Sequence, residues 1–181
     1  PGRKRPGWRH WGSSFGHVVS LSADGTRLAV AGRSNSNDEG YVRVFDLLQD
    51  EWVQVGDDLL GEGERFDDYG AAMAMSGDGS RVVVGAPSKD GDIGTASGQV
   101  RLFELVDDGW VLVGAPINGG VDRGYLGGAL AISGDGARFA TSVRDRISSS
   151  DEMPGSVRLF DLIDGDWVQT AADLTGEYGD S

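Results

Sequence analysis

Short runs of apolar and β-branched residues alternate with glycine-rich polar turns along the chain. In the middle of the chain, such runs cover residues 71–75, 81–84, 99–103 and 110–113. Runs of this length favour strands, and no segment carries the i, i+3, i+4, i+7 apolar spacing of an amphipathic helix. The pattern therefore predicts four strands in this stretch and close to no helix in the whole chain.

The four-strand pattern occurs three times. Each copy has an aromatic residue or leucine before a glycine, then a Ser-x-Asp-Gly turn, an alternating Val-Arg-x-Phe run and a Trp-Val pair. In order, these landmarks are Phe15-Gly16, Ser22 to Gly25, Val42 to Phe45 and Trp52; Tyr69-Gly70, Ser76 to Gly79, Val100 to Phe103 and Trp110; and Leu126-Gly127, Ser133 to Gly136, Val157 to Phe160 and Trp167. The period is roughly 57 residues, and self-similarity at a long period marks a fold of stacked supersecondary units.

Tandem four-stranded antiparallel units are the blades of a β-propeller, so the predicted fold class is all-β and propeller-like. The units are predicted at residues 14–68, 69–125 and 126–173, after a basic and aromatic N-terminal arm at 1–13. Three blades do not complete a ring, which takes about four to eight. Residues 174–181 are interpreted as the start of a truncated fourth repeat, so we expect a piece of a longer array or two chains that complete a ring together. A β-trefoil is the alternative with three four-stranded units, and the started fourth repeat argues against it.

The most regular residues of the repeat are interpreted as structural. An Asp-Gly pair suits a tight hairpin, because glycine accepts positive φ and the aspartate caps nearby backbone donors. The pairs are Asp24-Gly25, Asp78-Gly79 and Asp135-Gly136. Aromatic residues that occur once per unit are predicted to pack in the core or between units, namely Trp52, Trp110, Trp167, Phe45, Phe103 and Phe160. An arginine also recurs, at Arg43, Arg101 and Arg158, and we expect each to pair with a carboxylate of its own or the adjacent unit.

The charge balance limits the choice of partner. The 181-residue chain carries a formal net charge of −13 and no cysteine. Nucleic acid is not an expected partner, since phosphate binding needs clustered Lys and Arg. Basic residues without neighbouring acids gather with two tryptophans in the N-terminal arm, so the candidate partner-binding residues are Arg3, Arg5, Arg9, Trp8 and Trp11. No run of about 18 apolar residues is present, and no membrane span is predicted.

The repeat resembles the FG-GAP repeat of integrin α-subunit propellers. The second unit matches best, with Tyr69-Gly70 at the FG position and Gly85-Ala86-Pro87 as a complete GAP. The first unit keeps Phe15-Gly16, while the third keeps only Leu126-Gly127. In that family a calcium loop of the form D-x-[DN]-x-[DN]-G-x-x-D commonly lies between FG and GAP, because calcium needs 6 to 8 oxygen ligands. Here the place holds one carboxylate per turn, so no metal or other cofactor is predicted. The acidic loops at Asp90-Gly91-Asp92 and residues 62–68 are interpreted as solvated charge, with weak cation binding as the alternative.

No catalytic constellation is evident from the sequence. The two histidines are His10 and His17, no Gly-x-Ser-x-Gly elbow is present, and no phosphate-binding glycine motif occurs. We therefore predict that the chain is not an enzyme but a protein-binding or scaffold module, a segment of a larger propeller or a subunit of an assembly. The expected partner is a protein, further repeats of the same parent chain, or a second copy that completes a ring. Two alternatives are a carbohydrate-active or other hydrolytic propeller that uses acidic loop residues, and a calcium-dependent adhesion module. The family resemblance favours an extracellular or organelle-lumen location.

Overall fold

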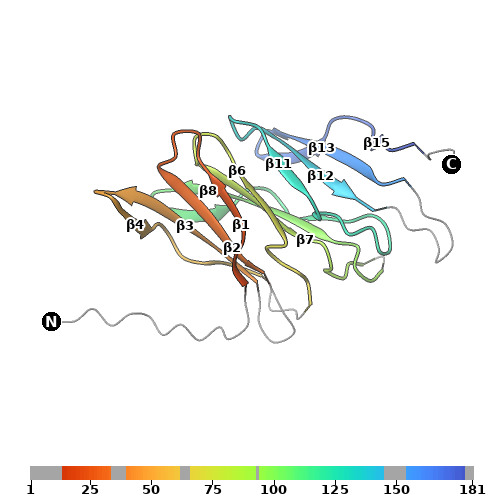
Figure 1. The fold of residues 1–181 in the computed structure, drawn as a ribbon. Coiled ribbons are helices and arrows are strands. Elements are labelled where there is room, and N and C mark those ends of the chain that lie inside the picture. The colour runs from red at the N-terminus through yellow and green to blue at the C-terminus, as the bar shows by residue number, and fades with distance from the viewer. Residues whose placement is uncertain (1–13, 34–39, 62–65, 93, 145–153, 178–181) are drawn as a thin grey trace.

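The computed structural model describes residues 14–33, 40–61, 66–92, 94–144 and 154–177, which contain fifteen strands and no helix (Figure 1). The predicted N-terminal arm lies outside these residues. No helix able to cross a membrane occurs within the described ranges.

The strands form three separate antiparallel sheets, which we call blades 1, 2 and 3. Blade 1 (residues 14–61) contains β1 (Ser14–Leu21), β2 (Arg27–Arg33), β3 (Tyr41–Leu48), β4 (Glu51–Gln54) and β5 (Leu59–Leu60). Blade 2 (69–118) contains β6 (Ala72–Met75), β7 (Arg81–Ala86), β8 (Gln99–Val106), β9 (Gly109–Leu112) and β10 (Ile117–Asn118). Blade 3 (126–177) contains β11 (Leu130–Ile132), β12 (Arg138–Val143), β13 (Ser156–Ile163), β14 (Asp166–Gln169) and β15 (Leu174–Thr175).

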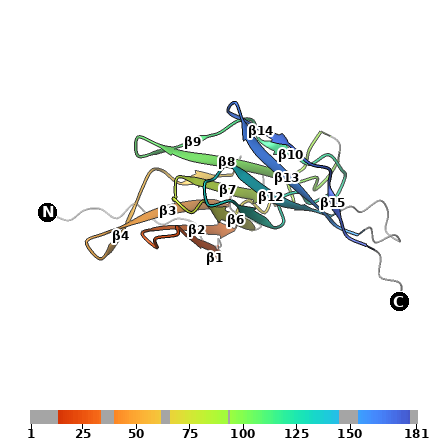
Figure 2. The same cartoon turned by 90° about the horizontal axis from the view of Figure 1, so that it is seen from above.

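Within each blade, four strands are neighbours in chain order, and a short fifth strand extends the outer edge beside the third. The predicted all-β fold of tandem four-stranded antiparallel blades is therefore confirmed. The alternative β-trefoil is wrong, because each unit pairs its own strands into a sheet of its own. Seen from above, blades 1 and 3 lie at opposite ends of the molecule, with blade 2 between them (Figure 2).

The outer edge of each blade is one strand interrupted by a bulge. In blade 1, β4 and β5 both pair with β3, and residues 56–58 bulge out opposite Arg43. The guanidinium of Arg43 holds this bulge, with 2.7 Å between its Nη2 and Asp58 Oδ2. In blade 3, Arg158 binds Asp173 of the equivalent bulge, with 3.0 Å between Nε and Oδ2. The predicted pairing of these two arginines with carboxylates is confirmed.

Blade 2 differs at the bulge, because Pro116 occupies the position of the acidic residue. Arg101, which lies opposite this bulge, reaches back to blade 1, where its Nη1 donates to the Leu60 carbonyl oxygen at 3.4 Å. Arg43 and Arg158 therefore hold the bulges of blades 1 and 3, whereas Arg101 links blade 2 to blade 1.

The bulge also corrects the predicted end of the third repeat. Leu174 and Thr175 pair with Val157 and Ser156 of β13, so both belong to the sheet of blade 3. The boundary predicted after residue 173 falls inside this sheet. The outer strand continues after the bulge, and the local sequence pattern does not indicate this continuation. Of the segment 174–181, residues 178–181 lie outside the described residues.

The core lies between the blades. Alternating side chains of β2 and β3, such as Ala31, Val42 and Val44, pack against Val82 and Val84 of β7. The opposite face of blade 2 packs in the same way against blade 3, with Val83, Val100 and Leu102 meeting Phe139 and Phe160. Strands β6 and β7 of blade 2 thus bury residues on both of their faces, which explains their nearly continuous apolar sequences.

Candidate functional site

The hairpin that joins the first two strands of each blade is closed by its aspartate. Asp24 accepts hydrogen bonds from Ser22 Oγ at 2.7 Å and from the Thr26 amide at 3.0 Å. The bond from Ser22 is the largest of several that lower the pKa of Asp24 to about 2. The hairpins of blades 2 and 3 repeat this arrangement around Asp78 and Asp135. The glycines that follow have positive φ, at 73°, 71° and 67° for Gly25, Gly79 and Gly136. These bonds agree with the structural role predicted for the three Asp-Gly pairs.

The hairpins of blades 2 and 3 also rest in a pocket of the preceding blade, which we call the socket. A socket consists of a serine and an arginine next to the blade's own hairpin and a carboxylate on its third strand. The three sockets are Ser22, Arg27 and Asp46; Ser76, Arg81 and Glu104; and Ser133, Arg138 and Asp161. The first two sockets are occupied by the hairpins of blades 2 and 3, respectively.

The socket arginine binds the glycine of the incoming hairpin. Arg27 Nη1 donates to the Gly79 carbonyl oxygen at 3.0 Å, and Arg81 Nη1 donates to that of Gly136 at 3.1 Å. A Cβ placed on Gly79 would lie only 3.0 Å from Arg27 Cδ and 3.3 Å from Ser22 Cβ. The hairpin glycine is therefore required both by its positive φ and by its close contact with the neighbouring blade.

The socket carboxylate orients the arginine. Arg27 Nη2 donates to Asp46 Oδ2 at 2.8 Å, and Arg81 Nη2 donates to Glu104 Oε1 at 2.7 Å. In each case the carboxylate takes one edge of the guanidinium fork, and Nη1 is directed to the next blade.

In blade 3 the equivalent arginine–carboxylate pair is Arg138 and Asp161, and no further blade covers it in the described part of this chain. Arg138 Nη2 donates to Asp161 Oδ2 at 2.8 Å, and this hydrogen bond is the main cause that lowers the pKa of Asp161 to about 2. The Arg138 side chain is 60% exposed, whereas that of Arg27 is 20% exposed. No described residue accepts a hydrogen bond from Arg138 Nη1.

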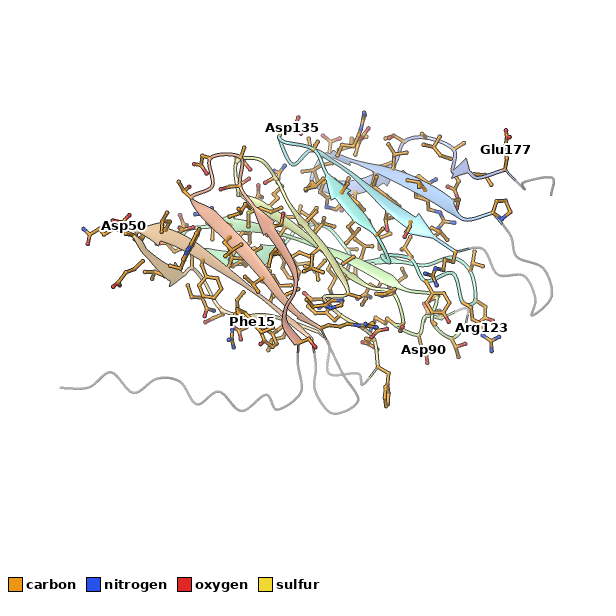
Figure 3. The ribbon with its side chains drawn as sticks, viewed as in Figure 1. Phe15, Asp50, Asp90, Arg123, Asp135 and Glu177 are labelled. Atoms are coloured by element: carbon orange, nitrogen blue, oxygen red, sulfur yellow. The ribbon has the colours of Figure 1, made fainter. Side chains whose placement is uncertain are left out.

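The blade 3 socket opens into a cavity of about 520 Å³ lined by Ser133, Asp135, Ala137, Arg138, Asp161, Leu162 and Ile163. Figure 3 shows Asp135 at this edge of the molecule, while Asp90 and Arg123 lie at the opposite edge. Three of the cavity's lining residues, Ser133, Arg138 and Asp161, are the counterparts of the residues that form the two occupied sockets.

Two further contacts connect neighbouring blades. The hairpin backbones form a relay, in which the Ala23 amide donates to the Gly77 carbonyl oxygen at 2.7 Å and the Gly77 amide donates to that of Gly134 at 2.8 Å. On the outer strands, the Trp110 indole N–H donates to the Val55 carbonyl oxygen of blade 1 at 3.1 Å. Within blade 3, Trp167 packs edge-on against Phe139, with 5.0 Å between ring centroids.

The outer faces of the two end blades expose the residue positions that are buried between blades. On blade 3, Leu174 is 62% exposed and Val157 is also exposed, whereas their counterparts Leu59 and Val42 in blade 1 are buried, Leu59 at 5%. On blade 1, Val19, Leu21 and Trp52 are exposed, although the counterparts Met73 and Met75 in blade 2 are buried. Each end thus presents one half of a blade-to-blade interface.

Five of the six repeated aromatic residues are buried, half-buried or packed against an interblade core. Phe103 and Phe160 are buried, Phe45 is half-buried, and Trp110 and Trp167 pack against the interblade cores. Trp52 departs from the prediction and is 44% exposed, because no described residue covers that face of blade 1.

Acidic residues at the edge opposite the hairpins accept hydrogen bonds from nearby loops and strands. Asp68 accepts hydrogen bonds from Arg33 Nε at 3.0 Å and from Ser88 Oγ at 2.7 Å. Asp122 accepts the Thr95 amide at 2.8 Å, and Asp90 accepts the Ala96 amide at 2.7 Å. Within the described residues, no group of three or more acidic or histidine side chains is placed to hold a metal ion. The candidate partner-binding residues Arg3, Arg5, Arg9, Trp8 and Trp11 lie outside the described residues.

The socket arginines were not singled out from the sequence, although a signal for them exists. An arginine follows each hairpin glycine by two positions, at Arg27, Arg81 and Arg138. Such a repeat indicates a framework position, but it does not show that the guanidinium points to the next blade rather than to solvent.

The comparisons with known proteins support the fold and say nothing of a family. No family model matches the sequence, and no curated protein matches it. Among solved structures, the chain is similar to Kuenenia stuttgartiensis hydrazine synthase, with a TM-score of 0.50 and 17% identity over 83% of this chain and 35% of that one. It is also similar to a putative TolB from Agrobacterium tumefaciens, with a TM-score of 0.44 and 17% identity over 93% of this chain and 52% of that one. The chain spans about a third and about half of these two proteins. The fold is that of tandem blades of the β-propeller type.

Proposed function

We propose that the chain is a non-catalytic protein-binding or scaffold module, a propeller segment whose end faces bind further blades. The observation that carries this proposal is the open socket of blade 3. Its Ser133, Arg138 and Asp161 repeat the geometry of two sockets that each hold a hairpin, and it lies beside an exposed apolar face.

The physical argument rests on what the end faces leave unsatisfied. Burying a leucine or valine side chain stabilises a contact by about 1.5–3 kcal/mol. Burial of Val157 and Leu174 by a partner is therefore favourable. Soluble proteins rarely keep a contiguous apolar patch without a binding role. The Asp161 carboxylate already holds the Arg138 fork in place, so a partner's carbonyl oxygen meets a preorganised donor.

The loop acids support a non-catalytic role. Asp68, Asp90 and Asp122 each accept hydrogen bonds from neighbouring loops or strands, which fits a structural role rather than hydrolysis. A glycoside hydrolase needs two carboxyl groups that face a common cleft about 5–9.5 Å apart.

The test is a tandem duplicate, in which residue 181 of one full copy is followed by residue 1 of a second. Blade 1 of the second copy then stands next to blade 3 of the first as a fourth blade. Leu174→Asp in the first copy is expected to lower the free energy of unfolding by about 1–3 kcal/mol, because the side chain is now in an interface. The same change in the single chain, diluted until sedimentation shows only monomer, is expected to cost less than about 0.5 kcal/mol.

Val111→Asp is the matched control, because Val111 is an exposed apolar residue on the outer edge of blade 2, away from both end faces. It is expected to have the same small effect in the single chain and in the duplicate. Equal small costs of Leu174→Asp in the two proteins would show that the end face does not bind a blade, and the proposal would be wrong.

A further inference from the structure

We propose that the two end faces of this chain fit each other, so that two copies join head to tail into a six-bladed ring. The blade 3 socket of one copy takes the Asp24-Gly25 hairpin of the other, and the same contact occurs a second time at the other junction. This inference rests on the proposed function and names its partner as a second copy of the chain.

The first argument is that blade 1 carries the element that the open socket is shaped to hold. The hairpins of all three blades have the same Ser-x-Asp-Gly sequence and positive-φ glycine. A Cβ built on Gly25 meets nothing within 4 Å, whereas those on Gly79 and Gly136 meet the socket arginine. The Gly25 carbonyl oxygen is thus the acceptor for Arg138 Nη1 of the other copy.

The second argument is charge. Within the chain, the arginines of the two occupied sockets interact with the aspartate of the incoming hairpin. The hydrogen bond to Asp46 raises the pKa of Arg27, and the charge of Asp78 in the next blade adds to the rise. Arg81 likewise helps to lower the pKa of Asp135, although the hydrogen bond from Ser133 contributes most. Arg138 is therefore placed to meet Asp24 of a second copy.

The third argument is that the remaining contacts also find their counterparts. The Gly134 amide continues the relay when it donates to the Ala23 carbonyl oxygen of the second copy, as Ala23 and Gly77 do within the chain. Val55 and Thr170 occupy the same place on their outer strands, since their amides bond the third strand at Val44 and Leu159. The exposed Trp52 indole of the second copy therefore has the Thr170 carbonyl oxygen as acceptor.

The number of blades in two copies is compatible with a closed ring. A contact between two different faces of a subunit is heterologous, and it gives a ring when the rotation closes or a filament when it does not. Two copies supply six blades, which lies within the four to eight of known propellers. Both apolar end faces are then covered.

Disulfide trapping tests the junction directly, because the chain has no cysteine of its own. Two single variants are prepared, Ala23→Cys and Gly134→Cys, and Gly134 has open space around its Cβ position. Mixing the two under mild oxidation is expected to give a cross-linked pair, since these positions face each other across the junction. Each variant oxidised alone is expected to stay uncross-linked, and cross-links of equal yield in all three samples would overturn the head-to-tail contact.

The mass in solution tests closure. Sedimentation of the full chain over a concentration series is expected to show a species of two chains and none larger. Monomer at every concentration, or steady growth into longer assemblies, would overturn the ring. Arg138→Ala is expected to weaken the association by about tenfold or more, while Arg123→Ala, at the opposite edge, leaves it unchanged.

The tandem duplicate separates this inference from the proposed function. In a closed ring, Leu174→Asp in the second copy lowers the melting temperature as much as the same change in the first copy. If Leu174→Asp lowers the melting temperature only in the first copy, a blade binds the end face but the duplicate does not close into a ring. The ring is then overturned, and the proposed function is not.

Discussion

Asp24 and Gly25 have different tasks although they are adjacent. The aspartate closes its own turn through Ser22 and the Thr26 amide, while the counterpart of the glycine in each following blade is bound by the preceding blade's arginine. A residue that was interpreted as part of a turn thus also contributes to the contact between blades. The aspartate can be tested apart from the glycine because its effect depends on pH.

Acid is expected to destabilise the chain through Asp24 and Asp161. Both have pKa values of about 2, because Ser22 and Arg138, respectively, donate hydrogen bonds to the ionised carboxylate. Since the folded pKa lies below the unfolded value of about 3.9, the carboxylates contribute stability that is fully present above about pH 5 and lost as the pH falls from about 4 to 2. Denaturant unfolding at each pH measures the free energy of unfolding, and NMR titration of the carboxyl carbons measures the two pKa values.

Asp24→Asn and Asp161→Asn serve as controls, since each amide removes one titration. The acid-dependent loss of stability is expected to shrink in each variant and to be smallest in the double variant. If Asp24 titrated near pH 4 in the folded chain, the assigned hydrogen bonds would be wrong.

At the scale of a blade, the outer strand is the element whose role changes most along the chain. In blade 2 its tryptophan, Trp110, donates to the Val55 carbonyl oxygen of blade 1; in blade 3, Trp167 packs on Phe139; in blade 1, Trp52 is exposed. The strand sequence is nearly the same in all three cases, so the difference comes from what lies next to it.

Trp52→Ala and Trp167→Ala are therefore expected to differ in a dilute, monomeric chain. Trp167→Ala removes packing from the core between blades 2 and 3 and is expected to cost about 2–4 kcal/mol of unfolding free energy. Trp52→Ala removes an exposed ring and is expected to cost less than about 1 kcal/mol. Chemical denaturation monitored by circular dichroism measures both, and equal costs would contradict the exposure of Trp52.

At the scale of the whole molecule, Asp135 of the blade 3 hairpin lies at one edge, and Asp90 of a blade 2 loop lies at the opposite edge (Figure 3). The net charge of −13 is thus compatible with a scaffold in which carboxylates serve the turns, sockets and loops that hold the blades. This arrangement leaves single carboxylates rather than clusters in the described residues.

Calcium is accordingly expected to leave the melting temperature of the chain unchanged. Each hairpin supplies one carboxylate, whereas calcium takes 6 to 8 oxygen ligands. Thermal unfolding with millimolar calcium, compared with the same concentration of magnesium and with a chelator, measures this. A rise specific to calcium would instead support the adhesion alternative.

Much of the blade was predictable because its strands are local patterns. The runs at 81–84 and 99–103 lie within β7 (Arg81–Ala86) and β8 (Gln99–Val106), and the Asp-Gly turns lie where the hairpins are. The short strands β5, β10 and β15 were not predicted. They follow a bulge with a positive-φ glycine in blades 1 and 2, at Gly56 and Gly114, so the local sequence resembles a loop.

The sequence by itself determined the three blades, since alternation, turn residues and the long repeat depend only on neighbours along the chain. The tertiary structure alone decided which repeated residues connect one blade to the next. Arg27 and Gly79 are 52 positions apart, and nothing local shows that the guanidinium reaches that carbonyl. It also decided that identical positions have opposite environments, because burial of Leu59 and exposure of Leu174 depend on whether a neighbouring blade covers the face.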